Sequence, residues 1–168
     1  MHAAARRSRR AAVLGVIAAV VALLVIAAPA SPASAKTVRK GAVPKWVVKK
    51  CRTGTVICIN KTTRKLVYMK KGKAILRMDA RFGDAYNPTR EGTFTVYWKH
   101  ANHVSTLYGS AMPYSMFFSG GEAIHYSSDF KAYGYAHHSH GCVNIRDYNG
   151  MKWLYNHVPQ GTKVVVYH

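Results

Sequence analysis

Short apolar runs and apolar–polar alternation fill the chain from residue 55 onward, and both patterns predict β-strands. The runs are rich in β-branched or long apolar residues and are separated by polar turns. One further stretch alternates as a half-buried strand does, and it follows a turn at Asn87-Pro88. The expected strands cover residues 55–60, 65–70, 74–80, 93–98, 121–126 and 163–167.

A helix is expected after Asp147, because an aspartate at this place can cap the first turn. The apolar residues that follow have the i, i+3, i+4, i+7 spacing of one buried helix face. Pro159 and Gly161 end the helix. The buried face would consist of Met151, Leu154, Tyr155 and Val158.

Two segments lack a clear period. Residues 103–121 mix aromatic residues with Gly and Ser and predict a loop with a short strand, and residues 127–138 predict an exposed loop. The whole pattern therefore predicts a mainly β domain with one C-terminal α-helix.

The N-terminal 35 residues have the pattern of a secretory signal peptide. Four arginines between residues 6 and 10 precede an apolar, uncharged stretch, Ala11 to Ala28. A stretch of small residues then ends at Ala33-Ser34-Ala35, where cleavage is expected. An uncleaved N-terminal membrane anchor is the alternative, since the apolar stretch is just long enough to span a bilayer. The paired arginines leave general secretion and twin-arginine export both open.

The charge balance is strongly basic, with 25 Lys and Arg against 6 Asp and Glu. Residues 1–35 carry four of the arginines and no acid, so residues 36–168 have a net charge of +15. Such an excess favours an anionic neighbour such as a cell-wall polymer, although the cations could also only solvate the surface. No nucleic-acid-binding motif is present. Residues 36–54 predict a basic lead-in, and residues 55–168 predict the domain itself.

Three cysteines, Cys51, Cys58 and Cys142, leave one thiol over in an exported chain that can form disulfides. Cys51 and Cys58 are seven residues apart with Thr53-Gly54 between them, so they could close a small loop. Both could instead be buried free thiols. If they are bonded, Cys142 stands alone, and catalysis is one reason for a lone exported thiol.

A thiol attacks acyl groups as its thiolate, so it needs a base nearby. His140 is close to Cys142 in sequence, but neighbouring residues point apart. His125 ends an expected strand, which could hold it rigidly beside Cys142. Gly141 lets backbone amides approach an oxyanion. The alternative use of this stretch is a zinc site formed by His137, His138, His140 and Cys142.

The string Ile124 to Asn144 resembles the signature of the L,D-transpeptidase catalytic domain, also called the YkuD domain. That signature is a His, a gap of about fourteen residues or slightly more, then Ser/Thr-His-Gly-Cys, a hydrophobic residue and Asn or Arg. Here the gap is 13 residues. The matching positions are His125, Ser139, His140, Gly141, Cys142, Val143 and Asn144. Residues 87–96, 112–118 and 161–167 also resemble the family, although Asn87-Pro88 departs from its usual Thr-Pro pair.

This resemblance implies a β-sandwich fold with the cysteine at the mouth of a cleft. It implies that Cys142 is the nucleophile and His125 the general base, oriented by the backbone carbonyl of Tyr126. The amides of His140, Gly141 and Cys142 would bind the oxyanion.

The resemblance also implies the substrate and the cofactor requirement. Ser139, His140 and Gly141 would shape the turn that presents Cys142. Asn144 would contact substrate or brace that turn, and Tyr114 would either line the cleft or pack in the core. The implied reaction is cross-linking of peptidoglycan stem peptides in the cell wall, with no metal or cofactor and with acylation by carbapenems. A carboxypeptidase that uses water as acceptor and a non-catalytic wall-binding module are the alternatives.

Overall fold

The computed structural model describes residues 48–168. The expected signal peptide, residues 1–35, and residues 36–47 of the expected lead-in lie outside the described residues. Among the residues that are described, no helix is long and apolar enough to cross a membrane.

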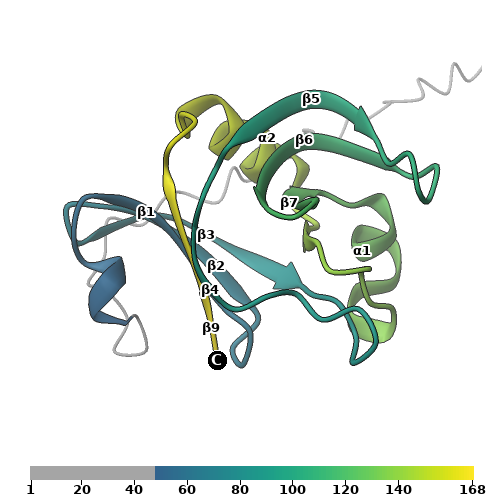
Figure 1. Ribbon diagram of the computed structural model, residues 1–168, viewed down its shortest axis with the longest axis horizontal. Coiled ribbons are helices and arrows are strands. Elements are labelled where there is room, and N and C mark those ends of the chain that lie inside the picture. The colour runs from purple at the N-terminus through teal and green to yellow at the C-terminus, as the bar shows by residue number, and fades with distance from the viewer. Residues whose placement is uncertain (1–47) are drawn as a thin grey trace, which may run out of the picture. The chain divides into compact units, whose positions relative to one another are not determined.

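Residues 48–168 form one curled sheet of nine strands in the order β4-β9-β1-β2-β3-β8-β7-β6-β5 (Figure 1). The strands are β1 (Thr55–Asn60), β2 (Lys65–Lys70), β3 (Lys73–Arg81), β4 (Gly92–Thr95), β5 (Trp98–Val104), β6 (Ala111–Ser119), β7 (Glu122–Tyr126), β8 (Val143–Ile145) and β9 (Lys163–Tyr167). The helices are η1 (Lys49–Cys51), α1 (Ser128–Tyr133), η2 (Gly134–Ala136) and α2 (Tyr148–His157).

The sheet curls because both of its halves contribute to one main core. Ile57 and Leu66 come from the half around β1 and β2, whereas Met116 and Ile124 come from β6 and β7. Leu154 of α2 completes this core, and all five residues are fully buried. β3 joins the halves, since it pairs with β2 on one side and β8 on the other. The expected fold class, a mainly β sandwich-like domain with a helix after Cys142, is confirmed.

Most of the expected elements are confirmed at nearly the expected bounds. β1, β2 and β9 begin and end as the apolar runs predict, and β3 is longer by one residue at each end. The Asp147 carboxylate caps α2 by accepting a hydrogen bond from the Gly150 N–H, and Met151 and Leu154 lie on its buried face.

The expected single strand at residues 93–98 is wrong, because two strands lie there. β4 pairs with β9 and β5 pairs with β6, so they occupy opposite edges of the sheet. The chain leaves one edge at Val96, whose N–H donates to Thr162 O and whose carbonyl accepts from the Gly161 N–H. Alternation alone could not reveal this break, since both strands share the same apolar–polar period.

The two expected loops are also corrected. Residues 98–119 form the hairpin β5–β6 rather than a loop with a short strand, and its strands pair from Trp98↔Phe117 to Val104↔Ala111. In the expected loop at 127–138, α1 begins after Ser127, whose hydroxyl accepts from the Phe130 N–H. Burial of Phe130 holds this short polar helix against the sheet.

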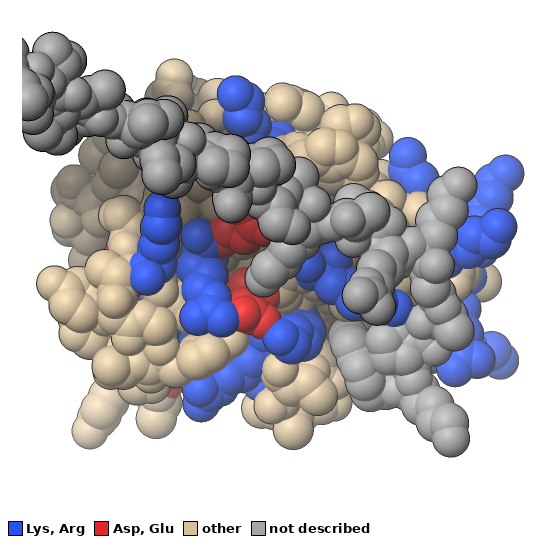
Figure 2. All heavy atoms as spheres, turned by 180° about the vertical axis from the view of Figure 1, so that it is seen from behind, with Lys and Arg blue, Asp and Glu red and all other residues tan. Residues whose placement is uncertain are grey.

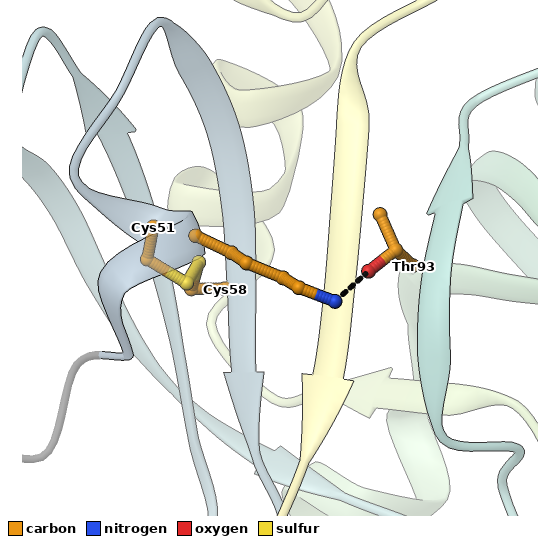
Figure 3. The surroundings of a disulfide bond; sticks show 4 residues. Cys51, Cys58 and Thr93 are labelled. Carbon is orange, nitrogen blue, oxygen red and sulfur yellow. Dashed lines mark hydrogen bonds between the residues drawn. A yellow bond between two sulfur atoms is a disulfide. The ribbon is translucent and has the colours of Figure 1, made fainter.

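A disulfide joins Cys51 of η1 to Cys58 of β1, so the expected pair is present (Figure 3). Both cysteines are fully buried in a second, smaller core with Val56, Val67 and Val165. The bond therefore fixes η1 to one face of the sheet, and Cys142 is the remaining free thiol in the chain.

Candidate active site

A cleft of about 1080 Å³ opens where β3, β7 and β8 meet. Its walls come from the ends of these strands, from the loops around residues 86–90 and 105–110, and from the segment 137–142. The segments that line it are far apart in the sequence, so the sheet order creates the cleft. Among the expected site residues, the cleft contains His125, Ser139, His140, Gly141, Cys142 and Asn144.

The pairing of β7 with β8 brings the expected base and nucleophile together. The two strands are parallel, with His125 opposite Asn144. Cys142 comes directly before β8 and packs against Ala123, which lies two residues before His125 and therefore on the same face of β7. His125 and Cys142 therefore both project into the cleft.

His125 is held in one orientation and one tautomer. Its side chain is 7% exposed, and its Nδ1 lies 2.7 Å from the carbonyl oxygen of Tyr126. Because a carbonyl only accepts, Nδ1 carries the hydrogen and Nε2 is left as the base. Burial lowers the pKa of His125 to about 4, against a smaller raising effect of the Tyr126 carbonyl. The imidazole is thus neutral at pH 7 and able to take a proton.

The Cys142 thiol is mostly protonated at rest. Burial raises its pKa, a backbone hydrogen bond from Ala123 lowers it, and the nearby Glu122 carboxylate raises it further. The side chain is half-buried against Met112, Phe117 and Ala123. At rest the two groups are accordingly a neutral thiol and a neutral imidazole, so use of the sulfur as a nucleophile would require transfer of its proton.

The turn that presents Cys142 is fixed at both ends. The Ser139 hydroxyl donates to the carbonyl of Cys142 at 2.6 Å, and the Ser139 N–H donates to Phe82 O at 2.9 Å. Gly141 has a φ of +107°, which few other residues adopt, and a Cβ there would lie 3.3 Å from Glu122 Oε1. Glycine is therefore required at this position. The oxyanion role of the amides at 140–142 stays a prediction.

A second glycine lets a neighbouring loop press against this turn. A Cβ on Gly83 would lie 1.7 Å from the carbonyl oxygen of Asn87 and 2.9 Å from the Gly141 nitrogen. The loop closes on itself because Asp84 Oδ1 accepts hydrogen bonds from the N–H groups of Tyr86 and Asn87. Residues 83–87 thus support the turn at residues 139–142 by direct backbone contact.

The histidines around Cys142 diverge. His140 is exposed and stacks on Tyr108 with ring centroids 4.1 Å apart, whereas His137 Nδ1 lies 2.9 Å from Asp129 Oδ1. Within residues 48–168 no three His, Cys, Asp or Glu side chains gather as a metal site would need. This geometry therefore gives no support to the zinc alternative. The His140 ring stacks on Tyr108 at the surface, whereas His125 is buried.

Asn144 and Tyr114 lie in different places. Asn144 is buried between Arg81 of β3 and His125 of β7 in the cross-strand register. Tyr114 does not line the cleft, which corrects that alternative. Its hydroxyl lies 3.1 Å from that of Tyr148 on α2, and its ring packs against Tyr155. A φ of +60° at Tyr114 interrupts the alternation of β6 and turns the ring to the core side.

Two buried charged residues of the cleft, Arg81 and Glu122, were not predicted from the sequence. Arg81 donates from Nη1 to Gly134 O at 3.0 Å and from Nη2 to Asp129 Oδ2 at 2.5 Å. Glu122 Oε1 accepts from the Arg90 N–H at 3.1 Å, and burial raises the pKa of Glu122. The sequence did contain a signal for both residues, since each is a charged residue at one end of an apolar strand. Glu122 is also one of only six acidic residues in the chain.

Comparison with protein-family models gives one match, the L,D-transpeptidase catalytic domain, over residues 54–166. Comparison with curated proteins found no match. An L,D-transpeptidase from Stackebrandtia nassauensis is 29% identical, with 74% of this chain and 62% of that chain covered and a TM-score of 0.66. One from Xylanimonas cellulosilytica is 30% identical, with 68% and 61% covered and a TM-score of 0.61.

A third similar structure is the Ldtfm–avibactam carbamoyl enzyme. It is 29% identical, with 68% of this chain and 49% of that chain covered and a TM-score of 0.58. The present chain thus spans between half and about three-fifths of the length of these three relatives.

Proposed function

The chain belongs to the L,D-transpeptidase catalytic domain family, and from this premise we propose that it is an exported enzyme that forms 3→3 cross-links between peptidoglycan stems. One observation carries the proposal: the β7–β8 register directs a rigid, neutral His125 and the free thiol of Cys142 into the same cleft. Thiol acyl transfer needs these two groups in that relation.

In the first half-reaction, His125 Nε2 takes the proton of Cys142 as the sulfur attacks the carbonyl of the third stem residue, a diamino acid. The carbonyl oxygen becomes an oxyanion, which amides of the turn at 140–142 stabilise. Collapse of this intermediate breaks the amide bond to the fourth residue. His125 returns the proton to the leaving D-Ala amine, and Cys142 holds the stem as a thioester.

In the second half-reaction, the side-chain amine of a neighbouring stem attacks the thioester carbonyl. His125 removes a proton from this amine and returns it to the Cys142 sulfur as the thioester bond breaks. A new amide bond joins the two third residues. A thioester suits this transfer because it stays reactive toward amines while the cleft limits access of water.

Location outside the cytoplasm rests on the signal-like N-terminus, the Cys51–Cys58 disulfide and the basic charge. Disulfides persist in oxidising compartments. A charge of +15 on residues 36–168 favours retention on an anionic wall. Acylation by carbapenems is part of the same proposal, and the carbamoyl enzyme that a 29% identical relative forms with avibactam supports it.

The proposal is tested by incubating the exported form, residues 36–168, with tetrapeptide muropeptides and analysing the products by mass spectrometry. The wild type should yield 3→3 dimers, and Cys142→Ala should yield none. Equal dimer formation by Cys142→Ala would remove the assignment.

The same assay separates the two alternatives. Tripeptide products that persist when an amine acceptor is in excess would indicate a carboxypeptidase with water as acceptor. Binding of muropeptides with no product from the wild type would indicate a wall-binding module without catalysis.

A further inference from the structure

Seven exposed cations gather at one end of the sheet, which we call the basic end. Figure 2 shows Lys and Arg side chains along its right-hand edge, which corresponds to the η1, β1 and β2 side of Figure 1. The basic end consists of Lys49, Lys50, Arg52, Lys70, Lys71, Lys73 and Lys163, all exposed.

The sheet register forces these cations together. Lys70 of β2 lies opposite Lys73 of β3, and Lys163 of β9 lies opposite Val56 at the start of β1. Neighbouring strands are about 4.8 Å apart, so the cations of β9, β2 and β3 lie within roughly 14 Å of one another, with β1 between β9 and β2. Like charges directly opposite each other in a ladder are destabilising. An unbalanced cluster of this kind is stabilised by an anionic partner.

The disulfide adds the cations of η1 to this row. It holds Cys51 against Cys58 of β1, and Lys50 Nζ reaches across to donate to Thr93 Oγ1 at 3.5 Å, the dashed line in Figure 3. Arg52 lies beside the β2–β3 turn, since a Cβ on Gly72 would be 3.1 Å from its carbonyl oxygen. Lys50 of η1 thus extends toward β4, and Arg52, which directly follows η1, lies beside the turn between β2 and β3.

No carboxylate balances the basic end. The chain has six acidic residues, and all six lie among the described residues, so none remains in residues 1–47. Asp79 lies in the far half of β3 and pairs with Lys65 and Arg146, while Glu91 pairs with Lys61 and His168. The others are Asp84, Glu122, Asp129 and Asp147, in the loops and elements around the cleft and at the start of α2.

We propose that the basic end is a docking surface for a linear phosphodiester polymer. Six of the seven cations are lysines, which act as flexible point charges and do not impose the planar two-point geometry of arginine. They therefore suit a chain of phosphates with variable spacing. A bilayer is less suitable, since none of the exposed large apolar side chains belongs to η1, β1, β2, β3 or β9.

The basic end is separate from the cleft. Lys73 begins β3 and Arg81 ends it inside the cleft, a separation of about 26 Å at the usual rise per residue. A polymer bound there leaves the cleft open to stem peptides. The inference rests on the proposed location at the wall, but it concerns residues that take no part in acyl transfer.

The test measures binding of fluorescently labelled inorganic polyphosphate by anisotropy to residues 36–168. Lys70→Gln/Lys73→Gln should weaken binding at least about tenfold, because it removes two cations that lie directly opposite each other in the ladder. The salt dependence of its binding should be shallower, because fewer counterions are released. The matched control is Lys131→Gln/Lys152→Gln on α1 and α2, which should change binding less than twofold.

Two results would overturn the proposal. One is equal weakening by the control pair, which would mean that only total charge matters. The other is tighter binding to anionic vesicles than to polyphosphate, with the same dependence on Lys70 and Lys73, which would indicate a membrane. Acylation by a carbapenem, measured on the same samples, should be unchanged in both variants. If the wild type were not acylated, the proposed function would be contradicted, but the conclusion about polyphosphate binding would still hold.

Discussion

The two ends of β3 lie in regions that differ in their secondary structure and in their buried polar groups. Around Lys73 lie paired strands with one register shift between Tyr68 and Met69, a disulfide and an apolar core, whereas around Arg81 the walls are loops and strand ends. Among the described residues, the buried side-chain atoms that lack a hydrogen-bond partner are Arg81 Nε, Glu122 Oε2 and Asn144 Oδ1. All three belong to residues that line the cleft.

This difference indicates that the region near Lys73 contributes mainly to stability and the cleft region mainly to reactivity. A buried polar group without a partner costs about 1–3 kcal/mol, and the region near Lys73 has none of these. The unpaired atoms lie in the cleft region, where a substrate or water would supply the missing hydrogen-bond partners. Substitutions near the disulfide should therefore reduce the free energy of unfolding and leave thiol reactivity intact, whereas substitutions near Arg81 should alter reactivity.

Among substitutions outside His125 and Cys142 themselves, the largest effect is expected from Gly83→Ala in the cleft region. The new methyl group would collide with the carbonyl of Asn87 and push the loop away from the turn at residues 139–142. Overpacking against backbone should lower the free energy of unfolding by about 3 kcal/mol and slow carbapenem acylation more than about tenfold. Urea unfolding and intact mass report these effects. The control is Gly109→Ala, which meets no atom within 4 Å and should cost only about 1 kcal/mol for its φ.

Acid should destabilise the cleft region through His125. Its pKa in the folded state is about 4, against about 6.5 when unfolded. The unfolded chain binds this proton more readily, so about 3 kcal/mol of stability present above pH 6.5 is lost as the pH falls toward 4. Urea unfolding at pH 7 and pH 4.5 measures the loss. His125→Asn should show a clearly smaller loss over this range, and an equal loss would contradict the burial of a neutral imidazole.

Removing the disulfide tests the region near Lys73, which should affect stability without affecting the cleft. Cys51→Ala/Cys58→Ala opens a loop with a sequence separation of 7 and should lower the free energy of unfolding by about 2 kcal/mol. Carbapenem acylation of Cys142 at a temperature where the variant is folded should match the wild type. A loss of acylation as large as that of Gly83→Ala would show that the two regions are not independent.

The smallest effect is expected from Glu122→Gln. Burial and the nearby Glu122 carboxylate both raise the pKa of the Cys142 thiol, so removing the charge should lower that pKa. Iodoacetamide alkylation at pH 8 should speed up by roughly two- to fivefold, because more thiolate is present. Glu91→Gln, which removes an acid paired with Lys61 at the surface, is the matched control and should leave the rate unchanged.

The sequence predicted the regular region better than the cleft region for a physical reason. β1, β2, β9 and α2 are local patterns of burial, which a window of a few residues contains. The break at Val96 and the pairing of β5 with β6 depend on partners far along the chain. A window that contains only the local alternation cannot reveal either of them.

The site divides in the same way. The spacing from His125 to Cys142 lies within one short motif, so the sequence predicted that both residues belong to one site, and both line the cleft. Their catalytic roles stay a prediction. Arg81 and Glu122 join the cleft only through the register of β3, β8 and β7, which no local pattern encodes. Tyr114 was left between two alternatives because its positive φ, which decides its direction, is invisible in the sequence.

The claim that His125 activates Cys142 is tested most directly by intact mass after exposure to a carbapenem at pH 7. The wild type should gain the mass of one inhibitor, Cys142→Ala should gain none, and His125→Ala should be acylated at least about a hundredfold more slowly. His140→Ala should react within a few-fold of the wild type, since His140 stacks on Tyr108 at the surface. Rapid acylation of His125→Ala together with loss of acylation in His140→Ala would contradict the assignment of the base.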